Sequence, residues 1–208
     1  MAGVYGFRSR HYICARGLGR LVDAGDLPGP DVLRLHPALP YFETSEAGRR
    51  VGEFPALVAR VTGADGAPAS LHRTWLAADG SGKAPVPSPK KIASPARPNA
   101  LRGSAIRLFP ATDRLAVAEG IETALAVRAL TGLPAWAGVC AHGLETVAIP
   151  PGLAELVIGA DNDVTGVGER AAHRLGQRAL REEVACVKVA VPKRVGDDWA
   201  DVLVGRST

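Results

Sequence analysis

The sequence predicts an α/β protein in which a smaller, basic α+β subdomain precedes a parallel sheet flanked by helices. After Pro110, short apolar runs alternate with helical patterns, and strands that are apolar on both faces are typical of parallel sheets. Before Pro110, turn signals and prolines dominate. Residues 1–110 hold 15 Lys and Arg against 8 Asp and Glu, whereas residues 111–208 hold 10 against 13. We therefore expect two domains, residues 1–110 and residues 111–208.

The composition limits the class of protein. With 208 residues, 47% of them hydrophobic, the chain can bury a substantial core. No apolar run resembles a signal peptide or is long enough to cross a bilayer, so we expect no membrane partner. Cys14, Cys140 and Cys186 are widely spaced without a CxxC pair, which argues against a zinc ribbon and a disulfide framework. These features predict a cytoplasmic protein.

The first half is expected to be mainly extended. A helical or turn-rich lead-in precedes a strand near residues 32–36. Residues 54–62 and 69–76 read as two strands joined by a turn at Asp65-Gly66. The following segment, APVPSPKKIASPARP, carries five prolines, which exclude a helix or a central strand. We predict an irregular loop there.

The second half predicts four strands, each followed by a helix or turn. The strands are expected at 114–119, 134–141, 153–161 and 184–192, and the helices or turns at 121–130, 143–150, 166–182 and 197–204. The helix positions expected to be buried are Ala124, Leu125, Val127, Leu130, Ala171, Leu175 and Leu180. Right-handed crossovers place the carboxyl ends of all these strands along one edge of the sheet.

Three of these strand ends are followed by acidic residues. The carboxylates concerned are Glu119, then Asp161 and Asp163, and finally Asp197, Asp198 and Asp201. Carboxylates that are crowded together repel one another unless a cation neutralises them. Oxygen ligands without Cys or His favour Mg²⁺ or Mn²⁺. Gly166, near the start of the next helix, is expected to give a phosphate access to backbone N–H groups.

The order of these motifs resembles the Toprim domain of primases, topoisomerases and certain nucleases. The matching segments are the strand ending in Glu119-Gly120, then IGADNDVTG with its helix, then GDDWADVL, over roughly residues 113–204. The resemblance implies a Toprim-type sheet in which Glu119 is the general acid or base, and Asp161 and Asp163 hold Mg²⁺. Either Asp198 or Asp201 is the main ligand of the third motif, and Asp197 fits less well.

Among Toprim enzymes, the resemblance favours a DNA primase. A topoisomerase needs a tyrosine nucleophile and large gate domains, but the tyrosines are confined to residues 5, 12 and 41. The first half resembles the segment preceding Toprim in primases and primase-helicases of phages, plasmids and integrated elements of proteobacteria. The implied function is primer synthesis from NTPs on single-stranded DNA. Candidate nucleotide- or DNA-binding residues are Arg73, Lys83, Lys90, Lys91, Arg97, Arg102 and Arg107.

The sequence leaves several interpretations open. It contains neither a zinc-binding module nor a Walker A helicase segment, so a separate replicative helicase is an expected partner. A Toprim-type metal-dependent nuclease and a non-catalytic nucleic-acid-binding module are the alternative functions. Glu122 is either a supporting carboxylate of the site or a charge at a helix start. Trp75 either stacks on a base or covers the sheet. The histidines are interpreted as structural or surface residues, although His72 lies beside Arg73 in the basic half.

Overall fold

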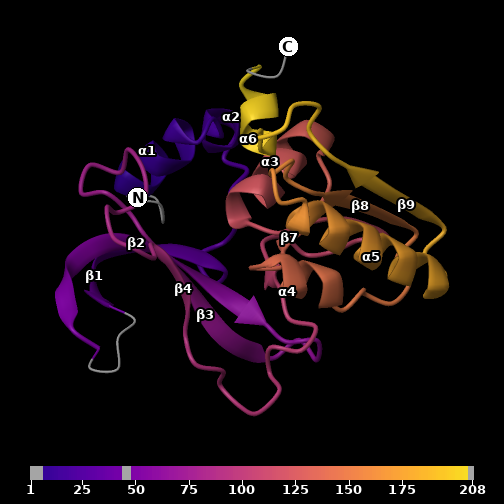
Figure 1. Cartoon of the computed structure of the whole chain (residues 1–208), viewed down its shortest axis with the longest axis horizontal. Coiled ribbons are helices and arrows are strands. Elements are labelled where there is room, and N and C mark those ends of the chain that lie inside the picture. Colours follow the sequence, from indigo (N-terminus) through magenta and orange to yellow (C-terminus); the bar gives the residue numbers. More distant parts are fainter. Residues whose placement is uncertain (1–6, 44–47, 206–208) are drawn as a thin grey trace.

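The structure, a computed structural model, describes residues 7–43 and 48–205 and consists of two sheets side by side (Figure 1). The first is antiparallel, with strand order β1-β2-β3-β4. Its strands are β1 (Leu33–Phe42), β2 (Arg50–Thr62), β3 (Pro68–Trp75) and β4 (Lys90–Ile92). The second has the order β5-β7-β6-β8-β9 and lies on the C-terminal side.

The β2–β3 hairpin forms as predicted. Asp65 accepts a hydrogen bond from the backbone N–H of Ala67 at 3.0 Å, and Gly66 has a φ of +81°, which a residue without a Cβ adopts at little cost. The predicted irregular loop at residues 84–98 is partly wrong, because Lys90–Ile92 pairs with β3 as the short strand β4. Prolines before and after these three residues confine the pairing to the edge of the sheet.

Two helices precede the first sheet: α1 (Phe7–Ala15) and α2 (Gly19–Asp23). The helix α1 was not predicted from the sequence, although Tyr12 and Ile13 on it are buried. The turn after α1 includes Gly17, whose φ is +76°, and a Cβ there would lie 2.3 Å from Cγ1 of Val204. The N-terminal helices are therefore packed closely against the C-terminal end of the described chain.

The second sheet confirms the predicted parallel arrangement. Its strands are β5 (Ile106–Arg107), β6 (Arg114–Ala118), β7 (Ala135–Ala137), β8 (Glu155–Gly159) and β9 (Cys186–Ala190). The strands β6, β7, β8 and β9 are parallel, and β5 adds an unpredicted antiparallel edge. Because β5 precedes residue 110 but belongs to this sheet, the division of the chain at residue 110 stays a proposal.

Helices cover both faces of the second sheet (Figure 1). They are α3 (Ile121–Thr131), α4 (Ala141–Thr146), α5 (Val167–Arg181) and α6 (Trp199–Leu203). Along β6, Leu115 and Val117 pack with α4 and α5, whereas the alternating Ala116 and Ala118 pack with α3 and α6. On the face covered by α3, Gly159 permits close packing, since a Cβ there would lie 2.6 Å from Val127.

Two helix positions predicted to be buried are exposed. Leu130 is 43% exposed and Leu180 is 60% exposed. Each lies in the last turn of its helix. Ala179, in the same turn as Leu180, is fully buried, and Leu180 follows Ala171 by about 2.5 helical turns, so it lies on the outer face of α5. The remaining predicted positions on both helices are buried.

One hydrophobic core joins the two sheets. It contains Leu33, Leu57 and Val61 of the first sheet together with Tyr12 of α1 and Leu125 of α3. This shared core fixes the carboxyl edge of β6 and β8 opposite β3 and β4. None of the helices in the described ranges is long and apolar enough to span a membrane.

Candidate active site

The acidic site begins at the ends of two neighbouring parallel strands. Ala118 on β6 pairs with Gly159 on β8, so Glu119 and Asp161 leave the sheet side by side. The third carboxylate, Asp163, follows in the loop before α5. A Cβ built on Gly168, in the first turn of α5, would lie 3.4 Å from Oε2 of Glu119 and 3.7 Å from Oδ2 of Asp163. The fold therefore brings three of the predicted residues to one place.

The pKa values of Asp161 and Glu119 are both raised above their ordinary values. Burial raises the pKa of Asp161 to about 6, and the charges of Asp198 and Glu119 add to this rise, opposed by Thr123 and Lys90. Thr123 donates its hydroxyl to Asp161 at 3.1 Å. Burial and then the charge of Asp163 raise the pKa of Glu119. Burial is thus the main cause of both raised pKa values, and the neighbouring carboxylates add to it.

The loop that carries Asp163 is built by local hydrogen bonds. Oδ1 of Asp163 accepts from the backbone N–H of Thr165 at 2.7 Å, from that of Gly166 at 2.9 Å and from the Thr165 hydroxyl. These bonds, the hydroxyl's first, lower the pKa of Asp163. Between the two aspartates, Asn162 donates to the Pro192 carbonyl at 2.8 Å. The N–H of Gly166 therefore already binds Asp163, and a phosphate contact there stays a prediction.

The third acidic motif forms the start of α6. Asp198 accepts from the backbone N–H of Asp201 at 3.0 Å, and Asp201 accepts from that of Asp198 at 3.2 Å, which makes a capping box. Oδ2 of Asp198 also forms an ion pair with Nη2 of Arg16 at 2.7 Å. Both residues thus have structural partners, and their assignment as metal ligands stays a prediction. Trp199 links the start of α6 to the residue that follows β8, because its Nε1 donates a hydrogen bond to the Ala160 carbonyl at 2.9 Å.

Arg16→Ala is expected to lower the free energy of unfolding by about 1 kcal/mol, because Arg16 and Asp198 are 35% and 28% exposed and water weakens their pair. Urea unfolding measures the change. The exposed Arg20, in the next helix, provides the matched control, and Arg20→Ala should leave stability unaltered. Equal stabilities for the two variants would show that the ion pair contributes nothing.

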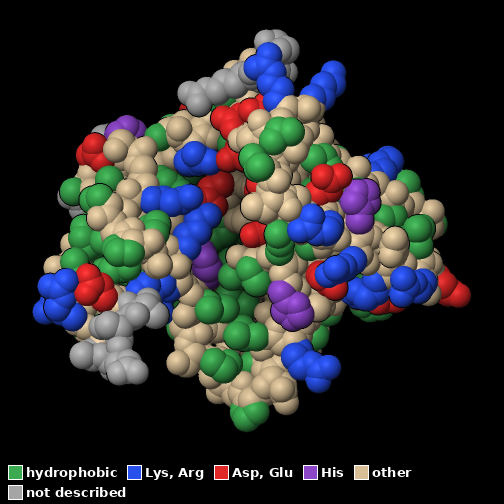
Figure 2. Space-filling view, viewed as in Figure 1, with side chains coloured by type: hydrophobic (Ala, Val, Ile, Leu, Met, Phe, Trp, Pro, Cys, Tyr) green, Lys and Arg blue, Asp and Glu red, His purple; other side chains and the backbone are tan. Residues whose placement is uncertain are grey.

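Basic side chains form a wall on one side of a hollow between the two sheets (Figure 2). On the other side lies the acidic edge, the edge of the second sheet that carries Glu119, Asp161 and Asp163. Lys90 of β4 donates to Oε2 of Glu122 at 2.9 Å, and the hydroxyl of Tyr12 donates to Oε1 of Glu122 at 2.7 Å. Burial raises the pKa of Glu122, but Lys90 and Tyr12 outweigh burial and lower it to about 2. Burial and then the charge of Lys90 lower the pKa of Lys83. Two of the predicted basic residues, Lys83 and Lys90, therefore lie together at this wall.

The other predicted basic residues make separate contacts. Arg97 pairs with Asp65, and Arg107 donates to the Gly63 carbonyl at 2.8 Å, so both lie at the β2–β3 turn. Lys91 lies 4.3 Å from the Tyr41 ring centre, and Arg73 lies 5.2 Å from that of Trp75. Arg102 helps to line a cavity of about 740 Å³ beside α4. Trp75 is buried and donates to the Leu39 carbonyl, so it covers the sheet.

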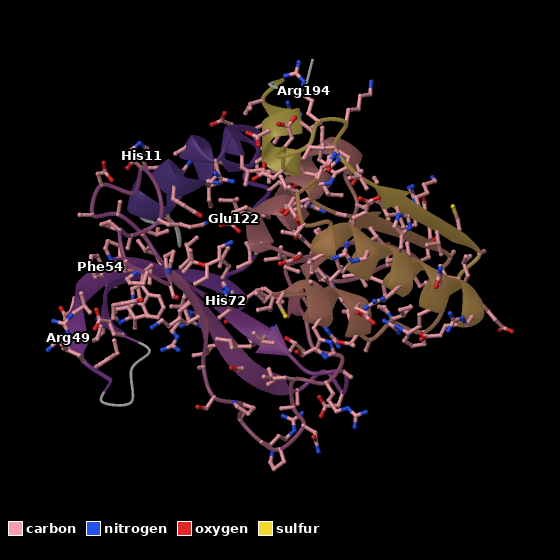
Figure 3. The ribbon with its side chains drawn as sticks, viewed as in Figure 1. His11, Arg49, Phe54, His72, Glu122 and Arg194 are labelled. Carbon is pink, nitrogen blue, oxygen red and sulfur yellow. The ribbon has the colours of Figure 1, made fainter. Side chains whose placement is uncertain are left out.

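Sequence reasoning missed four residues that shape the hollow. Tyr12 comes from the unpredicted α1 and Arg16 from the turn that follows it, and Thr123 follows Glu122 on α3 without any motif of its own. His72 is buried on β3 at the floor of the hollow, with Glu122 on the opposite side (Figure 3). The His72-Arg73 pair on a predicted strand was the only sequence signal for His72. Glu122 is buried and bonded to Lys90 and Tyr12, so it is more than a charge at a helix start, and its role as a supporting carboxylate of the site stays a prediction.

The residues at the acidic edge fit a hard divalent cation by their chemistry. Glu119, Asp161 and Asp163 offer only oxygen ligands, and the first two carry raised pKa values that a bound cation would lower. Within residues 7–43 and 48–205, no group of three or more His, Cys, Asp or Glu side chains is close enough to hold a metal ion.

Comparison with known protein families divides the chain in two. Residues 114–208 match the Toprim domain family, and residues 4–103 match a domain of unknown function, DUF7146. A comparison with curated proteins found no match. The Toprim match covers β6 to α6 and therefore includes every residue of the acidic edge.

Several solved structures of primases share the fold. The E. coli primase catalytic core has 15% sequence identity and a TM-score of 0.55, with 97% of this chain and 70% of that chain covered. A DnaG primase catalytic domain bound to single-stranded DNA has 14% identity, the same TM-score and the same coverage. A DNA primase domain from Pseudomonas aeruginosa has 16% identity and a TM-score of 0.49, with 92% and 56% covered.

These comparisons decide the fold. The chain spans 56% of the length of the Pseudomonas structure and 70% of each of the other two. At 14% and 15% identity, the likeness to the two longer matches shows a shared fold and leaves the activity to be tested. Residues 114–208 form a Toprim domain, and the chain has the fold of a Toprim-domain primase core.

Proposed function

We propose that the chain is a metal-dependent nucleotidyltransferase that synthesises short primers from NTPs on single-stranded DNA. The observation that carries this proposal is the pair of facing walls, with oxygen ligands on one side of the hollow and Lys83 and Lys90 on the other. Transfer of a nucleotidyl group needs a site for a divalent cation and positive charge for the phosphates. The DNA bound to the structurally similar DnaG domain supports single-stranded DNA as the template.

The chain's own groups divide the work of the proposed reaction. Asp161 and Asp163 would hold Mg²⁺ or Mn²⁺, which when bound neutralises the triphosphate and the leaving pyrophosphate. Lys90 and Lys83 neutralise the phosphates from the opposite wall. Glu119, whose pKa is raised first by burial, accepts the proton of the attacking 3′-hydroxyl. Lys90 is held for this task by Glu122, which also accepts a hydrogen bond from Tyr12.

A single assay separates the proposed function from its alternatives. Purified protein is mixed with Mg²⁺ or Mn²⁺, labelled NTPs and unlabelled single-stranded DNA, and a parallel reaction carries labelled DNA without NTPs. We expect the label of the NTPs to enter short oligonucleotides only when metal and template are present. Cleavage of the labelled DNA would instead identify a nuclease. DNA binding without either reaction would identify a non-catalytic module.

The proposed partners follow from the same reaction. A separate replicative helicase would supply the single-stranded template, because primers are needed where a duplex is opened. The template contacts proposed for Arg73, Lys91, Arg97, Arg102 and Arg107 then lie outside the hollow and would act on the DNA backbone. The cysteines in the described part of the chain are free thiols, which supports the proposed cytoplasmic location.

A further inference from the structure

The buried imidazole of His72 is the polar group at the floor of the hollow that the proposed reaction has not used. His72 is only 6% exposed. Within the described ranges, its Nδ1 is buried and has no hydrogen-bond partner. A buried polar atom without a partner costs about 1–3 kcal/mol. A persistent cost of this kind at a hollow indicates a group whose partner arrives with a ligand.

The strand geometry directs His72 into the hollow. Thr74 pairs with Lys90 across β3 and β4, and side chains opposite each other lie on the same face of a sheet. His72 is two residues before Thr74 and therefore shares that face. Figure 3 shows His72 and Glu122 on the two sides of the hollow.

Burial and then nearby positive charge keep the His72 ring neutral. Burial and then the charge of Lys90 lower the pKa of His72 to about 4, with Arg73 acting in the same direction and Glu122 against it. At neutral pH the ring therefore offers one donor and one acceptor and no charge. Such a group suits a hydroxyl better than a phosphate, since Lys83 and Lys90 already supply charge for phosphates.

The position of His72 relative to Lys90 also favours a hydroxyl. Lys90 opposes the rise that burial causes in the pKa of both Glu119 and Asp161, so it lies near the acidic edge. Lys90 also acts on His72, whose other charged neighbours are Glu122 and Arg73. Lys90 thus lies near both His72 and the acidic edge, and its Nζ is 4.0 Å from the Cβ position of Gly120. A nucleotide with its phosphates beside Lys90 would therefore have its sugar near His72.

We propose that His72 is a specificity-determining residue that hydrogen-bonds a sugar hydroxyl of the bound nucleotide and thereby favours ribonucleotides over deoxyribonucleotides. This inference rests on the proposed function, because it assumes that a nucleoside triphosphate occupies the hollow. A site that pairs with a hydroxyl discriminates against the analogue that lacks it, because the site's own buried polar group is then left unsatisfied. His72 is left unsatisfied when dATP binds.

The test compares the binding of ATP, dATP and inorganic tripolyphosphate by calorimetry in the presence of Mg²⁺. Wild-type protein is expected to bind ATP at least about tenfold more tightly than dATP. This is the change in affinity expected when a missing hydrogen bond leaves a buried polar group unsatisfied. In His72→Leu the preference should fall to near unity, while dATP and tripolyphosphate bind as in wild type. His72→Asn, whose amide lies near the position of Nδ1, should keep part of the preference and serves if the leucine variant does not fold.

Other results would overturn the proposal. A wild-type protein that binds ATP and dATP equally, or variants that keep the full preference, would remove the sugar contact. Loss of tripolyphosphate binding in a folded His72→Leu protein would make His72 a phosphate ligand instead. These measurements need no catalysis, so they are distinct from the primer assay. A protein that prefers ATP through His72 but makes no primer would contradict only the proposed function.

Discussion

Asp161→Asn is expected to abolish metal-dependent primer synthesis while making the metal-free protein more stable. The loss of activity should exceed the roughly 10–100-fold effect of removing an outer partner of a metal ligand, because Asp161 would hold the ion directly. The gain in stability arises because burial and two negative neighbours raise its pKa to about 6. The ionised carboxylate therefore destabilises the folded state, by an amount that grows as the pH rises from 3.8 to about 6 and is complete above that, and the variant should be stabilised by about 1–3 kcal/mol at pH 7.5.

Primer assays and thermal unfolding in EDTA measure the two effects. Asp31→Asn is a matched control, since Asp31 is an exposed aspartate of the first subdomain, and it should alter neither quantity. A metal-free Asp161→Asn protein less stable than wild type would mean that the carboxylate has a structural role. Wild-type activity in this variant would remove Asp161 from the site.

Glu122→Ala is expected to lower the free energy of unfolding toward the lower end of about 3–5 kcal/mol, the cost of breaking a buried ion pair. The change leaves the Tyr12 hydroxyl and the Lys90 ammonium without their partner. The lower end applies because Lys90 is 36% exposed and can be hydrated. Tyr12→Phe removes only one hydrogen bond and should cost about 1 kcal/mol.

The effect of Glu122→Ala should also depend on pH. The folded pKa of Glu122 is lowered from 4.5 to about 2, so its contribution is fully present above about pH 4.5 and is lost as the pH falls toward 2. Urea unfolding at pH 7 and at pH 3 should therefore show a smaller difference between wild type and variant at pH 3. Equal differences at both pH values would show that the charge of Glu122 does not stabilise the fold.

Much of the second domain was predictable because its signals are local. The apolar runs before Glu119 and Asp161 mark buried parallel strands, and the crossover rule alone places their ends at one edge. The motif order then identified the Toprim domain. The antiparallel strand β5 was missed, since two residues, Ile106 and Arg107, show no periodicity.

The opposite wall of the hollow was much less predictable. Lys83 and Lys90 were among seven basic candidates, and no local pattern separates them from Arg97 and Arg107, which bind the β2–β3 turn. Their selection depends on which face of β3 and β4 meets α3, and this is set by the tertiary packing. The role of Arg16 is likewise hidden, because its partner Asp198 is distant in sequence and α1 carries only a weak helical pattern.

The most direct test of the acidic site is a crystal of the protein soaked in Mn²⁺ and measured for anomalous scattering. The site proposed here predicts a peak coordinated by the carboxylates of Asp161 and Asp163 beside Glu119, and no peak there in Asp161→Asn crystals soaked in the same way. A peak only elsewhere in wild type, or the same peak in the variant, would contradict the metal site on which the proposed reaction depends.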